Sequence, residues 1–412
     1  MARLWTNPRR LLANAQIRKV LETVATRYLV AFLNLVLLFV NAKVLGAEGL
    51  GLVGIILASM NLAVIFNSIF CGSTIVYFMN RYGMKRLVAP AYLWAVAGSA
   101  VATGGMAALG LFPLAYAADV YFLALLNSLI AANSRFLLGA DRVGGFNLVF
   151  FLQSGLLFFV LLFYYYIWEK PEVASYLQGL YITNGAALAV SFLLLRRKFA
   201  EKESIAVSRS SLLREMFVYG LWSNVDNLAE TLSSRLNYFL VQRFVGLSGV
   251  GLLDGGTKIS ESVWHISRAV GYIVNGEVAR SHDAGDQRQT TLRLLRLTFG
   301  ATSAVMLVIL CIPEWVYTDY LFSAEFEGIA NVIRCLAPGI VALACNTILS
   351  QYFIGSGRVK DSAYASCTGL AVLAVAGGVM VPLWGVSGGA GATSVAFGAM
   401  LAVSWAKFRK AK

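Results

Sequence analysis

The chain has 412 residues, of which 58% are hydrophobic and only 13% are charged, and its mean hydropathy is +0.70. These values exclude an ordinary soluble domain and indicate a membrane protein. A net charge of +13 would suit a nucleic-acid-binding protein. The basic residues, however, gather at alternate ends of apolar segments, which is typical of membrane topology, so no nucleic acid partner is expected.

Apolar stretches long enough to cross a bilayer recur along the whole chain. About 20 apolar residues, each rising about 1.5 Å along a helix, span a hydrocarbon core of about 30 Å. We expect twelve spans, six in each half. The first six are Thr23 to Asn41, Leu50 to Met79, Val88 to Phe112, Val120 to Leu138, Phe146 to Trp168 and Val173 to Leu195. The second six are Phe217 to Gln242, Val250 to Val278, Leu294 to Ile312, Ile329 to Phe353, Ala363 to Val381 and Val386 to Ala406.

The 34 Lys and Arg residues predict how these spans are oriented. Most of them lie on alternate loops or helix ends, including both termini and the central linker, so both termini are expected in the cytoplasm. The segment after Gly249 has an alternative interpretation as an amphipathic helix in the membrane interface. That alternative would turn the basic loop after it outward and invert the pattern for the rest of the chain, so we treat the segment as a span.

The longest polar stretch separates six spans from six and predicts two lobes. The expected division is an N-terminal amphipathic segment at 1–22, an N-lobe at 23–195, a cytoplasmic linker at 196–216, a C-lobe at 217–406 and a basic cytoplasmic tail at 407–412.

Two sequence repeats relate the halves. VLGAEGLGL at Val44 to Leu52 returns as FVGLSGVGL at Phe244 to Leu252, and GADRV at Gly139 to Val143 returns as GSGRV at Gly355 to Val359. Six helices per half, with the ends of each half on one side, predict parallel repeats about an axis along the membrane normal, with the translocation route between them. The glycines are expected in helix packing and tight turns.

Ionisable residues follow one face of the eighth segment and repeat on the seventh. At steps of three and four they are Asp254, Lys258, Glu261, His265, Arg268, Tyr272 and Asn275, preceded by Asp226, Glu230, Ser233 and Asn237. A charge at the bilayer centre costs about 2.5 to 3.5 kcal/mol on an insertion scale, so several facing lipid would be prohibitive. The pattern therefore predicts a hydrated cavity.

These side chains allow two kinds of chemistry. Guanidinium forks suit a phosphate or pyrophosphate that must leave water, and Arg268 with Lys258 and His265 is the first candidate group, followed by Arg235 and Arg334. The carboxylates Asp226, Glu230, Asp254 and Glu261 either bind or relay protons or sodium, or neutralise neighbouring cations as structural ion pairs. Arg27 and Arg135 either bind the phosphate groups as well or extend to the membrane surface. A last set of side chains either contacts the sugars of a substrate or joins and packs helices: Asn34, Asn61, Asn67, Asn127, Tyr238, Trp264 and Tyr272.

Enzymatic chemistry has little support. Gly255-Gly256-Thr257-Lys258 has the composition of a phosphate-binding loop in the wrong order, and the chain has only two histidines. The five cysteines show no metal-ligand spacing, so neither a metal nor a cofactor site is expected. We expect a transporter and not an enzyme, with a proton or sodium gradient as a possible driving force.

Three segments carry a family resemblance: Leu45 to Leu52, Val245 to Leu252 and VPLWGVSGGAGAT at Val381 to Thr393. With twelve spans in two lobes, the chain resembles the Wzx-type oligosaccharide flippases of the multidrug/oligosaccharidyl-lipid/polysaccharide (MOP) exporter superfamily. The resemblance implies an inverted-V fold with a cationic cavity in the bacterial inner membrane. It also implies transfer of undecaprenyl-pyrophosphate-linked oligosaccharide for O-antigen or surface polysaccharide synthesis, with membrane lipids and other polysaccharide-assembly proteins as partners.

Two other functions are weighed against this one. An ion-coupled multidrug-type exporter would have the same fold, but the first span carries Asn34 where related drug exporters have an acidic residue. A membrane-embedded glycan polymerase or ligase normally has a large outer loop, and the longest outward loop here, near Ile312 to Gly328, is short.

Overall fold

The computed structural model describes residues 15–199, 209–280 and 283–410. Those residues form helices and no β-strand, which confirms the all-α class. In chain order the longer helices are α2 (Ala15–Cys71), α3 (Ser73–Tyr82), α4 (Met84–Ala108), α5 (Ala117–Gly139), α6 (Val143–Phe150), α7 (Leu156–Leu162), α8 (Val173–Phe199), α9 (Arg209–Phe244), α10 (Leu247–Arg280), α11 (Ala284–Leu310), α12 (Ile329–Gly355) and α13 (Val359–Lys410). The short helical elements are η2 (Leu114–Tyr116), η3 (Phe151–Gly155), η4 (Phe163–Ile167), η5 (Val316–Leu321) and η6 (Ala324–Phe326).

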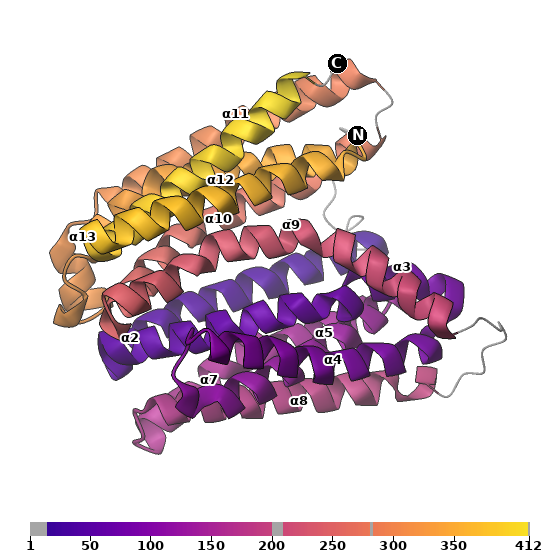
Figure 1. Cartoon of the computed structure of the whole chain (residues 1–412), viewed down its shortest axis with the longest axis horizontal. Coiled ribbons are helices and arrows are strands. Elements are labelled where there is room, and N and C mark those ends of the chain that lie inside the picture. Colours follow the sequence, from indigo (N-terminus) through magenta and orange to yellow (C-terminus); the bar gives the residue numbers. More distant parts are fainter. Residues whose placement is uncertain (1–14, 200–208, 281–282, 411–412) are drawn as a thin grey trace. The chain divides into compact units, whose positions relative to one another are not determined.

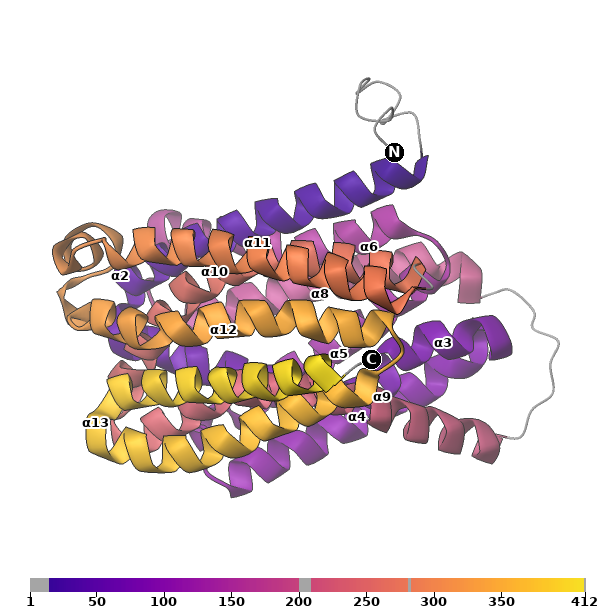
Figure 2. The ribbon, with the colours of Figure 1, turned by 90° about the horizontal axis from the view of Figure 1, so that it is seen from above.

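Eight helices of the described chain are long and apolar enough to cross a membrane. Two of the eight are interrupted by a kink, at Gly46 in α2 and at Gly385 in α13, so each provides two spans. Figure 2 shows α13 folding back on itself as a helical hairpin. Helices α9 and α10 have the required length but are not among these eight, and both carry several charged residues. With these two, the described residues supply the twelve predicted segments of a multi-pass membrane protein.

The chain forms two compact units that do not coincide with its two sequence halves. The first unit contains Met1–Leu37 and Ser59–Asn224, and the second contains Leu38–Ala58 and Val225–Lys412. Within the first unit α4, α5 and α8 pack side by side, and within the second α10, α11, α12 and α13 form a bundle (Figure 1). A segment of the first half, 38–58, therefore belongs to the second unit, and α9 is divided between the two.

Parts of the predicted domain boundaries are helical. Helix α8 continues to Phe199 and α9 begins at Arg209, so both ends of the expected linker at 196–216 lie inside helices, while 200–208 lie outside the described residues. Of the expected amphipathic segment, residues 15–22 form the start of α2, and 1–14 lie outside the described residues. Residues 407–410 of the expected tail form the last turn of α13.

The second sequence repeat has the same backbone conformation in both copies. Asp141 and Gly357 occupy matching positions and both adopt positive φ angles, 56° and 76°. In each copy the N–H of the following Arg donates to a carbonyl five residues earlier, from Arg142 to Leu137 and from Arg358 to Phe353. A positive-φ residue with this hydrogen bond closes a helix, and the next helix starts directly afterwards in both copies.

The first repeat brings two helices into backbone contact inside the second unit. Gly46 and Gly246 both have positive φ and turn the chain before the crossing. A Cβ on Gly51 would overlap the carbonyl oxygen of Leu247, and a Cβ on Gly251 would overlap that of Ala47. Gly51 corresponds to Gly251 in the repeat, and Ala47 corresponds to Leu247, so the two contacts are equivalent. In each contact the missing side chain of the glycine leaves room for the backbone of the other helix. The predicted packing role of these glycines is confirmed.

Candidate functional site

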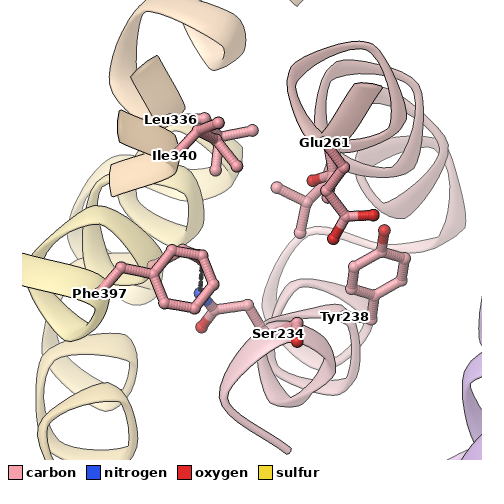
Figure 3. Close-up of a pocket in the computed structure, with 10 residues that line it drawn as sticks. Ser234, Tyr238, Glu261, Leu336, Ile340 and Phe397 are labelled. Atoms are coloured by element: carbon pink, nitrogen blue, oxygen red, sulfur yellow. Dashed lines mark hydrogen bonds between the residues drawn. The ribbon is translucent and has the colours of Figure 1, made fainter. Parts of the chain in front are cut away.

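The ionisable residues of α9 and α10 meet in the second unit. Both helices carry their polar side chains at helical spacing, and α10 packs mainly on α12, which brings apolar side chains opposite them. A pocket of about 10 Å³ lies at this junction, about the smallest cavity that holds one water molecule. Figure 3 shows Tyr238 and Glu261 on one side of the pocket and Leu336, Ile340 and Phe397 on the other.

Asp254 is the most deeply buried of the described charged side chains on α9 and α10. Among the described residues it is the one buried charged residue, with 2% of its surface exposed. Its Oδ1 accepts a hydrogen bond of 3.0 Å from the Tyr238 hydroxyl, and its Oδ2 lies 2.6 Å from Lys258 Nζ. Lys258 stands one helical turn further along α10 and is half-exposed, so it neutralises the carboxylate while its stem reaches outward.

Arg235 connects the two helices. Its Nη1 donates to the Tyr238 hydroxyl at 2.7 Å, and its Nη2 donates to Glu261 Oε2 at 3.3 Å. The guanidinium also lies 5.1 Å from the centre of the Tyr238 ring. The result is a continuous chain from Glu261 through Arg235, Tyr238 and Asp254 to Lys258. Two cations balance two carboxylates in it, so the network carries no net charge.

Asp254 and Glu261 are thus in ion pairs, which is one of the two alternatives that the sequence left open. Glu230 also has an interaction partner, while the side chain of Asp226 lies outside the described part of the structure. Whether any of these groups exchanges protons or sodium stays a prediction. Within the described residues no three His, Cys, Asp or Glu side chains gather as metal ligands.

Asn237 ties α9 to the second half of α13. Its side-chain amide donates to the Gly389 carbonyl and to the Thr393 hydroxyl, both at 2.6 Å, and its Oδ1 has no hydrogen-bond partner. Its spacing had placed Asn237 on the polar face of the seventh segment. Nothing in the sequence pointed to Gly389 or Thr393 as its partners, because they lie more than 150 residues away in a segment that reads as a packing motif.

Arg268 stands apart from this network. It lies ten residues beyond Lys258 on the same helix, about 15 Å along the axis, so the structure does not bring the first two candidate cations together. Its guanidinium lies 4.0 Å from the Trp264 ring centre, and the Trp264 indole N–H is anchored on Thr347 Oγ1 at 2.8 Å. Arg268 is exposed, and no carboxylate pairs with it in the described part of the chain.

The remaining candidates lie elsewhere or outside the described side chains. His265 is in α10, but its side chain is not among those described, and the same holds for Tyr272. Arg334 is exposed near the start of α12 and donates to the neighbouring Asn331 at 2.9 Å. In the first unit Arg27 lies over the rings of Phe146 and Phe150, at 5.4 and 4.0 Å. The ion-pair network is therefore built from α9 and α10, and Arg268 lies further along α10 with no carboxylate partner among the described residues.

No protein-family model matches the chain, and no curated protein sequence matches it. Several solved structures, in contrast, are similar to the chain. An inward-facing multidrug resistance MATE family transporter of the MOP superfamily is 15% identical, with 92% of this chain and 94% of that one covered at a TM-score of 0.72. Lipid II flippase MurJ in its inward closed conformation is 13% identical, with 96% and 88% covered at 0.74. A MOP superfamily transporter from Pyrococcus furiosus, described as having a binding pocket of reverse polarity, is 15% identical, with 95% and 94% covered at 0.60. The chain has the MATE/MOP-like transporter fold.

Proposed function

We propose that the protein is a flippase that moves undecaprenyl-pyrophosphate-linked oligosaccharide across the bacterial inner membrane, for the synthesis of O-antigen or another surface polysaccharide. One observation carries the proposal. The guanidinium of Arg268 is exposed on a polar face of a membrane-spanning helix and has no carboxylate partner among the described residues. A planar cation in that position is suited to the oxygens of a pyrophosphate.

The charge balance of the site favours an anionic substrate over a cationic one. Asp254 is occupied by Lys258 and Glu261 by Arg235, so neither carboxylate offers a free negative charge to a cationic drug. Arg268 lies outside that neutral network, further along the same helix, and provides a positive charge there. Trp264 beside it provides an aromatic face of the kind on which sugars stack, held in place by Thr347.

The proposed cycle follows from the substrate's chemistry. The head group is polar and anionic and must be shielded from hydrocarbon, while the prenyl tail is apolar and remains in lipid. The head group would contact Arg268 from the cytoplasmic side, and a change between inward- and outward-facing states would release it on the other side. The likeness to the lipid II flippase MurJ supports a fold compatible with such a cycle.

A second candidate is an ion-coupled small-molecule exporter of the multidrug type. The likeness to MATE family transporters favours it. A deletion strain separates the two. Loss of the flippase leaves lipid-linked glycan in the inner leaflet with unchanged drug resistance, whereas loss of a drug exporter changes drug resistance and leaves the glycan unaffected.

The decisive test removes the unpaired cation. We expect Arg268→Ala to abolish surface glycan and to retain lipid-linked glycan at the inner leaflet, detected by a leaflet-specific probe, at normal protein level in the membrane. Arg243→Ala serves as the matched control, because Arg243 is an exposed arginine at the end of α9. Full complementation by Arg268→Ala would remove this residue from the mechanism.

A further inference from the structure

A second hollow in the second unit has a different chemistry from the site on α9 and α10. It is a groove of about 480 Å³ between α11 and the last part of α13, with α12 as its floor. The residues that line it are Leu295, Arg296, Phe299, Cys345, Gly398, Leu401, Ala402 and Trp405. Seven of these eight carry no charge, and Arg296 is the exception.

The walls of the groove include exposed side chains of two helices that are apolar and long enough to span a membrane. Helix α11 has the smallest buried share, 17%, of the eight apolar spans in the described chain, so most of this span is not covered by protein. Phe299 is 55% exposed and Trp405 is 38% exposed, while Cys345 on the floor is only 6% exposed. A Cβ on Gly398 would meet no atom within 4 Å, so the groove is open at this glycine. An open and mainly apolar hollow on the surface of a membrane-spanning helix bundle is suited to a hydrocarbon chain.

Arg296 determines what kind of lipid the groove favours. It is exposed, and no carboxylate pairs with it among the residues that the structure describes. The sequence has no acidic residue on α11 after Asp286, none on α13 after Asp361 and none on α12. Arg288 and Arg293 precede it on α11, and basic residues also end α13. Asp361 neutralises Lys407 at the end of α13, but Arg296 has no such partner in the described part of the chain and leaves a positive charge at the groove. This charge favours a lipid with a net negative head group over a zwitterionic one, whose phosphodiester stands beside its own cation.

We infer that this groove is a binding site for an anionic phospholipid of the bilayer. One acyl chain lies along Phe299, Gly398 and Leu401, and the phosphate pairs with Arg296, while Trp405 is an aromatic residue of the type that prefers the membrane interface. The inference is independent of the proposed function, because none of the groove residues belongs to the network on α9 and α10.

The groove and the network share α12 and α13. Phe397 lines the small pocket beside Tyr238 and Glu261, and the next residue, Gly398, lines the lipid groove. A lipid in the groove therefore packs against the helices that form the apolar wall of the candidate site.

Lipid titration of the purified full-length protein tests the site. The probes are palmitoyl-oleoyl phosphatidylglycerol and the phosphatidylcholine with the same acyl chains, counted by native mass spectrometry. We expect one phosphatidylglycerol per chain, held about fivefold more tightly than phosphatidylcholine, the preference that one basic residue gives at a membrane surface. Arg296→Gln should remove this preference, and Gly398→Leu, which fills the open space, should weaken the binding of both lipids.

Two matched variants control for general effects. Arg243→Gln removes an exposed arginine charge at the end of α9, which does not line the groove, and Gly378→Leu adds the same side chain on α13 where a Cβ also meets no atom within 4 Å. Both should bind as the wild type does, and all four variants are compared at equal monodispersity. Equal binding of the two lipids by the wild type, a preference retained by Arg296→Gln, or unchanged binding by Gly398→Leu would overturn the inference and leave only annular lipid.

Discussion

The two units of the molecule join their helices with different polar chemistry. In the first unit the buried polar side chains that link helices are neutral. Asn67 Nδ2 donates to the hydroxyls of Ser99 and Ser128, both at 2.8 Å, and Asn133 Nδ2 donates to Ser191 Oγ at 2.8 Å. In the second unit the link between α9 and α10 is ionic and includes a buried carboxylate.

The difference shows where this fold contains an ion pair whose burial is energetically unfavourable. Neutral amides and hydroxyls suffice to hold membrane helices together at low cost. A buried ion pair contributes little net stability, because desolvation of both partners offsets their attraction. Among the described residues the first unit has an exposed ion pair, Arg81 with Glu215, whereas the buried carboxylate in an ion pair lies in the second unit. This contrast supports a role for α9 and α10 beyond packing, and four changes test it.

The largest effect should come from leaving Asp254 without its cation. Lys258→Met removes the partner at 2.6 Å and leaves a buried carboxylate uncompensated, which should destabilise the second unit by about 3 to 5 kcal/mol. Thermal unfolding in detergent measures the loss. Lys360→Met, a change at an exposed lysine, should have no effect, and adding Asp254→Leu to Lys258→Met should restore most of the stability. An unfolding temperature equal to that of the wild type would show that the pair is dispensable.

Placing a carboxylate among the neutral buried side chains of the first unit should reduce stability almost as much. Asn67→Asp keeps the shape of a fully buried side chain between Ser99 and Ser128 but introduces a charge without a cation. We expect a loss of about 2.5 to 3.5 kcal/mol, the cost of an isolated charge inside a membrane protein. The same unfolding assay applies at neutral pH. A variant as stable as the wild type would mean that the first unit accommodates charge as readily as the second.

Weakening the more exposed ion pair should have a moderate effect. Glu261→Gln removes the negative charge opposite Arg235, but both side chains are about one fifth exposed and Arg235 keeps its contact with Tyr238. A loss of about 1.5 kcal/mol is expected, the lower end for a hydrogen bond to a charged group. If Glu261→Gln is as damaging as Lys258→Met, the network acts as one unit and not as two pairs.

The smallest effect should come from one neutral hydrogen bond. Ser191→Ala removes the hydroxyl that accepts from Asn133 and leaves the packing of α8 almost unchanged. Interhelical hydrogen bonds in membranes average about 0.6 kcal/mol, so the unfolding temperature should fall only slightly. A loss comparable to that of Glu261→Gln would contradict the distinction between the two units.

Much of the architecture could be predicted because it depends on local order. Hydrophobic length gave the number of spans, and the predicted segments agree with the helices within a few residues, apart from α2, α9 and α11, which start eight, eight and ten residues earlier. The repeat copies predicted tight turns, and Gly46 and Gly246 both adopt positive φ. Glycine and apolar periodicity act over a few residues, so the chain alone displays them.

The arrangement of the site was only partly predictable. Asp254 and Lys258 are one turn apart, so their pairing follows from helical spacing. The pairing of Arg235 with Glu261 joins two helices and required their packing. The same is true of Glu325, whose carboxylate accepts from the Ala47 N–H at 2.8 Å and caps the helix after the kink, although 278 residues separate the two. No local pattern marks such a partner.

The sequence by itself determined that this chain crosses a membrane many times, that its halves are related, and that the seventh and eighth helices carry the unusual charges, because composition and periodicity are properties of neighbouring residues. The tertiary structure decided which charges neutralise one another, and it left Arg268 without a carboxylate partner among the described residues. It also placed 38–58 in the second unit and opened the groove at Gly398. Those outcomes depend on distances between residues remote in the chain, and such distances are set when helices pack.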